Sequence, residues 1–535
     1  MSLQKNWNIE IPPQTAEIGR ETMAASDPYR LVGDGVSEIL SWEDFAGLYS
    51  QVGRGAIHPI VLCLVTVFQY LENIPDRQAA RWAVMRMDWK YALHMPLKWQ
   101  GFHYSDLCNF RKRLLKHGAE RMIFDKVLDW VQGQGFLKKY AKQRTDSTQV
   151  LGAVERLSRL ELVWETLRLA LKAIQGEAPG WYGKQIPSAL HEAYVERHSA
   201  WRLSKQEVTA EMLKAGTDGF WLLDRLGESA PKGVLELSEV ETLRTVWEQQ
   251  FERGGDETKT RSPSGRGKGK DLVVTPHDPE ARWSEKRGKG WVGYRLQVTE
   301  TAEDEVAQQF ITDIDVVSAN RDDSEVIDEI QNRLQERGLK PEEHDVDQGY
   351  TSGANLAHSA ARGIELLGPV AQDTAGKPEG FRQSDFDLDF ETQQATCPRG
   401  KIAPTWYPRP SEAEDGYVGA EIQFKNECQS CPDRAECAPG KCGRTLKASP
   451  YYALLQQRRA EQETEEFKER YKRRAAIEGT ISEVVRAHGG RRARYRGHSK
   501  VRLQALFIGA ATNLKRLARA LAARNEQAQL SLATV

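Results

Sequence analysis

The stretch that most constrains this chain is a charged, proline-free run at residues 455–490, LQQRRAEQETEEFKERYKRRAAIEGTISEVVRAHGG. Its richness in Glu, Arg, Gln and Ala predicts one long helix, because these residues have high helix propensity. The closing glycine pair is typical of the position just beyond a last helical turn. Ile477, Ile481 and Val484 recur at spacings of four and three, which predicts a buried stripe.

Three polar residues share a neighbouring face of this predicted helix. Tyr471, Arg474 and Glu478 stand at positions i, i+3 and i+7, so their side chains line up. A tyrosine, a cation and a carboxylate in register fit a functional face, and they also fit an ordinary solvated helix face. The rest of the chain has to decide between these two interpretations.

Composition excludes few classes of protein, but the distribution of charge is informative. The 535 residues, 40% hydrophobic and 28% charged, predict a soluble protein of three or four domains with a formal net charge of −1. Residues 471–520 carry thirteen Lys and Arg but two acidic residues, which suits a polyanionic partner as well as a solvated basic face. No apolar run reaches about 18 residues and residues 1–25 lack a signal pattern, so we expect a cytoplasmic protein that does not enter a membrane.

Hydrophobic periodicity divides the chain into helical and α/β regions. Residues 1–135 are predicted to form a helical domain, in which helix 105–118 carries Arg111 and Arg113 and could enter a DNA groove or lie on the surface. Alternating strands are predicted around Asp146 and at 291–301, 309–319, 344–350 and 363–370, with a helix at 322–338. The order strand, strand, strand, helix, strand, strand is that of a ribonuclease H-like α/β core with a mixed sheet.

Two insertions interrupt this core. The predicted segments are the first core strand (136–150), a helical insertion ending in a flexible linker (151–270), the main core (271–375), a cysteine-rich insertion (376–454) and the closing core helices (455–525).

Three carboxylates can combine only if the fold brings them together. Asp146 lies on the first predicted strand, Asp347 on the fourth and Glu478 on the long helix, separated by 201 and 131 residues. Such a triad would bind two Mg²⁺ ions, because hard cations prefer oxygen ligands and complete their shells with phosphate and water. Asp345 is an alternative to Asp347, because it shares the same strand face.

Five of the seven cysteines cluster between positions 397 and 442, which predicts a metal site in a chain without secretion signals. Four-coordinate structural zinc is the first interpretation, with Cys397, Cys428, Cys431 and Cys437 as ligands and Cys442 as the spare or substitute. Free thiols and an iron–sulfur cluster are the alternatives. The metal would stabilise an insertion that has little core of its own.

These motifs resemble the DDE transposases of bacterial insertion sequences, in particular the subgroup with a Y-x2-R-x3-E signature. The resemblance rests on RTDSTQVLGAV around Asp146, DVDQGY around Asp347, YKRRAAIEGTISEVVR around Glu478 and the closing segment at 494–517. The family often has a lysine seven residues after the glutamate. Here that position is Val485, and Arg486 follows it.

The resemblance implies that Asp146, Asp347 and Glu478 bind two Mg²⁺ ions, for which Mn²⁺ can substitute. It implies that Tyr471 and Arg474 contact DNA near the cleaved end, with Arg486 as a replacement for the missing lysine. The expected partners are the double-stranded terminal inverted repeats, the target DNA and a second copy of the chain, in the cytoplasm on the nucleoid. A nuclease of the same fold without strand transfer, and a non-catalytic DNA-binding descendant, remain as alternatives.

Overall fold

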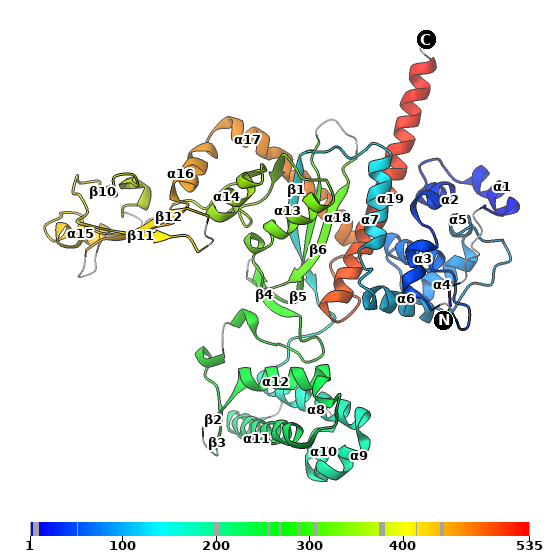
Figure 1. The fold of residues 1–535 in the computed structure, drawn as a ribbon, viewed down its shortest axis with the longest axis horizontal. Helices are drawn as coiled ribbons and strands as arrows, with labels where there is room; N and C mark the ends of the chain where they lie inside the picture. The colour runs from blue at the N-terminus through cyan, green and yellow to red at the C-terminus, as the bar shows by residue number, and fades with distance from the viewer. Residues whose placement is uncertain are drawn as a thin grey trace.

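The structure is a computed structural model that describes residues 2–3, 10–50, 52–195, 203–254, 257–266, 269–286, 288–303, 308–373, 380–412, 415–438 and 443–533. Figure 1 shows a central sheet with the N-terminal helices on one side and two further lobes extending away from it. None of the described helices is both long and apolar enough to cross a membrane.

The N-terminal region is helical, as predicted. Its helices are α1 (Pro13–Thr22), α2 (Pro28–Ile39), η1 (Glu43–Leu48), α3 (Pro59–Leu71), α4 (Asp76–Met85), α5 (Met87–Ala92), α6 (Ser105–Lys116) and α7 (Met122–Gly133). The apolar helix α3 is buried along almost its whole length, so the other helices pack around it. It also packs against the last helix of the chain, α19 (His498–Ala533).

The sheet has the predicted order of a ribonuclease H-like core, which confirms the predicted fold class. Its strands are β4 (Arg282–Lys286), β5 (Lys289–Thr301), β1 (Gln143–Leu151), β7 (Glu343–Asp345) and β8 (Glu365–Leu367) in spatial order, and β6 (Ile311–Ser318) also pairs with β5. The pairs of β5 with β1, β4 and β6 are antiparallel, whereas β7 is parallel to β1 and to β8. The crossover helices are α13 (Ile327–Glu336) and α14 (Gly353–Ala361), with the short η5 (Asp323–Glu325) before α13.

The helical insertion follows β1 and has its own hydrophobic core. It contains α8 (Arg159–Glu177), α9 (Pro179–Gln185), α10 (Ser188–Val195), α11 (Lys205–Ser229), η2 (Val234–Glu236) and α12 (Ser238–Gln250). The following segment is not the wholly flexible linker that its Gly, Ser and charge content predicted. It forms a hairpin of β2 (Phe251–Gly254) and β3 (Glu257–Thr260), then η3 (Ser264–Arg266) and η4 (Gly269–Asp271), because Phe251 is buried in the insertion core.

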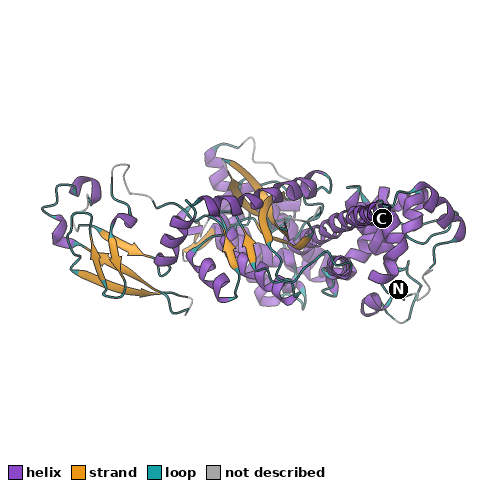
Figure 2. Cartoon of the chain, turned by 90° about the horizontal axis from the view of Figure 1, so that it is seen from above, coloured by secondary structure: helices purple, strands orange, loops and turns teal. Residues whose placement is uncertain are grey.

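The cysteine-rich insertion forms a small strand-rich lobe at one end of the molecule (Figure 2). Its elements are η6 (Gln383–Asp385), β9 (Asp387–Asp389), β10 (Gln394–Thr396), β11 (Thr405–Pro410), β12 (Val418–Gln423), η7 (Lys425–Cys428), α15 (Arg434–Cys437) and β13 (Thr445–Ala448). Strands β11, β12 and β13 form one antiparallel sheet over a small apolar cluster. This core is small, as expected for a module that needs further stabilisation.

The run at 455–490 is not one long helix, so that prediction was wrong. It contains α16 (Tyr452–Glu461), α17 (Glu465–Tyr471), the 3-10 segment η8 (Lys472–Ala476) and α18 (Ile477–Arg486). The Thr464 side chain accepts a hydrogen bond from the Phe467 N–H and starts a new helix. Phe467 is buried, so packing has overridden the uniform helix propensity of the run.

Candidate active site

Asp146 occupies a buried position in the central strand β1. Its Oδ1 atom accepts a hydrogen bond from the Ser147 N–H at 2.7 Å. Burial raises the pKa of the Asp146 carboxyl above its ordinary value, and the charge of Arg474 acts in the opposite direction. A carboxylate in this position is costly unless a cation accompanies it.

Asp347 follows the end of strand β7, which pairs with β1. Parallel pairing matches Arg144 with Asp345, the last residue of β7, and Asp347, two residues further on, shares a contact to Arg474 with Asp146. The Asp347 Oδ1 atom accepts a hydrogen bond from the Gly349 N–H at 2.8 Å. From the sequence we expected that only the fold could bring these aspartates together. The arrangement agrees with that expectation.

Arg474 links the two aspartates. Its Nη2 atom lies 2.6 Å from Oδ2 of Asp146 and 3.7 Å from Oδ2 of Asp347. Arg474 comes from η8, so the helical segment and the two parallel strands meet at one point. A single guanidinium group therefore stands between two carboxylates that are candidate cation ligands.

Glu478 begins α18, four residues beyond Arg474, and its side chain is exposed. Helix α18 packs against β1, which brings Glu478 to the same side of the core. Within the described ranges, however, no hydrogen bond or ion pair is recorded for Glu478, and no group of three or more His, Cys, Asp or Glu side chains is placed to hold a metal ion. Arg474 thus links two of the three predicted ligands, whereas Glu478 has no contact with them among the described residues.

Sequence reasoning missed a further acidic residue at this site, Asp323. A Cβ atom on Gly349 would lie 3.0 Å from Oδ1 of Asp347 and 3.4 Å from Oδ2 of Asp323, so these two carboxylates flank the glycine. Asp323 is held by Arg295 at 3.0 Å and by the Gln297 side chain at 3.0 Å. Only the pair of aspartates before helix 322–338 hinted at it in the sequence.

Asp345, the alternative to Asp347, has a different environment. It is fully buried, and Arg473 contacts its two carboxylate oxygens at 2.8 and 3.1 Å. Arg473 also pairs with Glu343, which is on the same strand. The carboxylate of Asp345 is therefore enclosed by a structural ion pair, whereas Asp347 is partly accessible.

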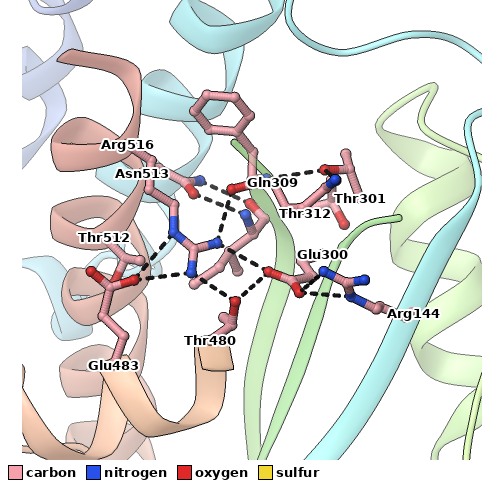
Figure 3. A network of polar contacts seen from close by, with 12 residues as sticks. Arg144, Glu300, Thr301, Gln309, Thr312, Thr480, Glu483, Thr512, Asn513 and Arg516 are labelled. Carbon is pink, nitrogen blue, oxygen red and sulfur yellow. Dashed lines mark hydrogen bonds and ion pairs between the residues drawn. The ribbon is translucent and has the colours of Figure 1, made fainter. Parts of the chain in front are cut away.

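A buried ionic network fixes α18 against the sheet (Figure 3). Glu300 of β5 is inaccessible to solvent and pairs with Arg144 of β1 at 2.7 Å and with Arg516 of α19 at 3.0 Å. The Thr480 hydroxyl of α18 donates to Glu300 at 2.5 Å, and Arg516 continues to Glu483 at 3.0 Å. Four core elements are thereby tied together behind the segment that carries Arg474 and Glu478.

Comparison with known proteins identifies this architecture. A family model described as a transposase DDE domain matches residues 396–518, and a second, described as a transposase domain (DUF772), matches residues 21–113. The chain belongs to the DDE transposases. No significant match was found among curated proteins or among solved structures.

The match at 396–518 spans Tyr471, Arg474 and Glu478 of the transposase. Asp146 and Asp347 lie outside both matched segments, so their place in the site rests on the sheet register and on the contacts of Arg474. The match at 21–113 covers helices α2 to α5 and most of α6.

Two arginines of α6 that were expected to contact DNA are engaged inside the transposase instead. Arg111 is 5% exposed and pairs with Asp76 at 2.5 Å, because it lies on the helix face that also buries Leu107 and Leu114. Arg113 donates to the Leu48 carbonyl at 3.0 Å and covers the ring of Tyr49. The exposed cations of this helix are Lys112 and Lys116.

The other DNA-contact candidates lie at the two ends of the η8–α18 segment. The Tyr471 ring stacks on Phe467 with 5.7 Å between ring centroids, and burial raises the pKa of Tyr471 to about 12. Arg486 is exposed at the end of α18. Tyr471 is therefore packed against Phe467, whereas the side chain of Arg486 is accessible to solvent.

The four predicted zinc ligands line one cavity of about 20 Å³, but among the described residues they are not arranged as a group that could hold a metal ion. The backbone N–H groups of Lys401 and Arg444 each donate to a sulfur at 3.4 Å, to Cys397 and Cys428 respectively. Burial raises the pKa of the Cys437 thiol, and the other three cysteines act in the same direction. Cys442 lies outside the described residues.

Proposed function

We propose that this transposase binds the terminal inverted repeats of an insertion sequence and catalyses Mg²⁺-dependent strand cleavage and strand transfer. The observation that carries the proposal is the contact of Arg474 with both Asp146 and Asp347. This contact concentrates two acidic ligands and one basic group at a single point of the core.

The residues at this point fit a divalent metal. Aspartate oxygens are hard donors, and the guanidinium of Arg474 shows that a cation is accommodated between them. Asp146, Asp347 and Glu478 would hold two Mg²⁺ ions, or Mn²⁺ in their place. When bound, such ions supply Lewis-acid activation of the attacking oxygen and stabilisation of the leaving one.

The protein residues prepare this chemistry. Strand β1 carries Asp146, and each of the two aspartates accepts a backbone N–H, which orients the carboxylates in advance. With metal ions held by the aspartates, the guanidinium of Arg474 would be available to bind a DNA phosphate next to Tyr471. The expected working unit is a homodimer on DNA, because two ends must be joined.

The cysteine-rich lobe would carry structural Zn²⁺ on Cys397, Cys428, Cys431 and Cys437. Backbone N–H groups that donate to sulfur favour the thiolate form that zinc requires, and two such donors are present. In this role the ion stabilises the lobe and takes no part in DNA cleavage.

Substitution of the carboxylates tests the proposal. Asp146→Ala, Asp347→Ala and Glu478→Ala should each abolish Mg²⁺-dependent cleavage of DNA that flanks the coding sequence, while binding of that DNA persists. Asp345→Asn serves as the comparison, because it changes a neighbouring structural carboxylate. If Asp345→Asn prevents cleavage in folded protein and Asp347→Ala does not, the second ligand is misassigned.

A pre-nicked end separates strand transfer from simple hydrolysis. The wild-type protein should join a free 3′-hydroxyl of the terminal repeat to a second duplex. Cleavage without joining would indicate a nuclease of the same fold, and DNA binding without either reaction would indicate a non-catalytic descendant.

A further inference from the structure

A groove of about 300 Å³ lies between α6 and the segment that leads into α19. Its walls include Cys108, Lys112 and Leu115 from α6, and Arg496, Lys500 and Leu503 from the other side. Apolar side chains and cations therefore line the same depression.

The charge of this groove is uniformly positive in the described part of the chain. Lys112, Arg496 and Lys500 are exposed, and no ion pair with an acidic residue is recorded for any of them among the described residues. Arg111, deeper in the wall, is neutralised by Asp76 and lies over the ring of Tyr495. Three uncompensated cations around an apolar floor complement a chain of phosphates and sugars.

The groove is physically continuous with the strand that carries Asp146. The Leu151 N–H at the end of β1 donates to the Arg491 carbonyl, and the Ala493 N–H donates to the Leu151 carbonyl, both at 2.8 Å. Arg496 follows three residues later and also lines a second cavity, of about 550 Å³, whose wall includes Gly152. Hydrogen-bonded backbone thus connects the end of the strand that carries Asp146 to residues 491–493, which precede Arg496.

The length of that strand beyond Asp146 corresponds to a short run of DNA. Five residues of extended strand separate Asp146 from Leu151, which is about 17 Å at roughly 3.3 Å per residue. A DNA duplex has one phosphate of each strand for about every 3.4 Å along its axis, so 17 Å along the axis corresponds to about five base pairs.

We infer that this groove, which we call the α6–α19 groove, seats the backbone of the duplex whose end is cleaved at Asp146 and Asp347. The inference rests on the proposed function and adds to it a specific binding surface. Lys112 and Lys500 would act as point charges for phosphate oxygens, and the planar guanidinium of Arg496 would bind phosphate in bidentate fashion. The contacts would fix the register of the end without reading its sequence.

Cys108 provides a direct probe, since it is an exposed free thiol in the wall of the groove. Full-length protein would be alkylated with N-ethylmaleimide, with and without a duplex that carries the DNA flanking the coding sequence, and labelling would be followed by peptide mass spectrometry. We expect bound duplex to slow labelling of Cys108 severalfold, while the buried Cys63 stays unlabelled in both samples. Unchanged labelling of Cys108 in protein saturated with duplex would overturn the inference.

Charge removal gives an independent test. Lys112→Ala, Arg496→Ala and Lys500→Ala should each weaken binding of the flanking duplex and reduce the slope of log affinity against log salt by about 0.9. Lys116→Ala is the matched control, because it removes an exposed cation of the same helix outside the groove. A slope lowered equally by Lys116→Ala and by the groove variants would assign binding to the whole helix face and reject the groove.

Different results would overturn the proposed function and the role of the groove. Absence of any binding to the flanking duplex would overturn the proposed function itself. Normal binding and cleavage with an unprotected Cys108 and unchanged salt slopes would overturn only the groove.

Discussion

Asp146 illustrates how a single buried charge depends on its neighbours. Burial raises the pKa of its carboxyl, and Arg474 and the more distant Lys286 lower it. The carboxylate is therefore stabilised by cations supplied by other elements of the fold, and any bound metal has to compete with Arg474 for the same oxygen.

Replacement of Arg474 should reveal this competition. We expect Arg474→Gln to tighten Mn²⁺ binding in the absence of DNA by about tenfold to a hundredfold, because a charge-assisted hydrogen bond of about 1.5–3 kcal/mol no longer opposes the metal. The same variant should bind the flanking duplex more weakly. Titration calorimetry with Mn²⁺ measures the first effect.

Lys286→Gln is the control for this experiment. It removes a charge that acts on Asp146 without any recorded contact to it. If Lys286→Gln tightens Mn²⁺ binding as much as Arg474→Gln does, direct competition by the guanidinium is excluded.

His344 makes folding sensitive to acid. It is completely buried in β7, its Nε2 atom lies 2.7 Å from the Thr145 hydroxyl, and burial lowers its pKa to about 4. Between about pH 6.5 and pH 4 the unfolded chain binds a proton that the folded chain excludes, so stability falls as the pH falls through this window.

At pH 5, His344 should lower the free energy of unfolding by about 2 kcal/mol, because each pH unit below 6.5 costs about 1.36 kcal/mol. His344→Gln should therefore lose less stability between pH 7 and pH 5 than the wild-type protein, as measured by urea unfolding at both pH values. His103→Gln changes an exposed histidine and should leave the difference unaltered. Identical pH dependence in wild type and His344→Gln would contradict the argument.

At the scale of elements, contacts on the buried side of α18 fix the position of this helix. Thr480 and Glu483 anchor the helix to Glu300 and Arg516, while Glu478 projects from its exposed face. The residues that hold the helix are thus different from those expected to perform chemistry, and they come from β1, β5 and α19.

Glu300→Gln should destabilise the protein by about 3 kcal/mol or more, because Arg144 and Arg516 are left in a buried site without their counter-charge. The resulting shift of α18 should also lower cleavage, although Glu300 is remote from DNA. Thermal unfolding and the cleavage assay measure the two effects. Glu483→Gln affects a more exposed carboxylate and should cost less; equal losses for both variants would show that burial of Glu300 is not the cause.

At the scale of the whole molecule, three hydrophobic clusters stabilise different parts of the chain. One joins the N-terminal helices, the sheet and α19, a second holds the helical insertion, and a third, much smaller, holds the cysteine-rich lobe. A long shared core makes the N-terminal helices and the catalytic sheet one unit, whereas the cysteine-rich lobe depends on its own few apolar residues.

We therefore expect a bound metal ion to contribute most to stability in the cysteine-rich lobe. We expect about one zinc per chain, and Cys428→Ser or Cys431→Ser should remove it and lower solubility and the unfolding temperature of the protein. Elemental analysis and calorimetry measure both effects. Absence of bound metal from freshly purified, reduced protein would refute the prediction, and a loss of cleavage without any loss of stability would assign the cysteines another role.

The sequence by itself determined the order of the core strands and the class of the core. Alternation and β-branched residues are local signals, and they mark β1 and β6 wherever the strands lie in space. The sheet order then follows from few topological choices, so β1 and β7 pair side by side.

Only the tertiary structure decided how the run at 455–490 is divided, which face of α6 is buried and where Asp323 lies. Helix propensity is a weak local preference, so the burial of Phe467 and the cap at Thr464 override it. Arg111 looks like a surface cation in the sequence, but Asp76, 35 residues away, draws it into the core. Such outcomes depend on partners distant in the chain, and no local pattern contains them.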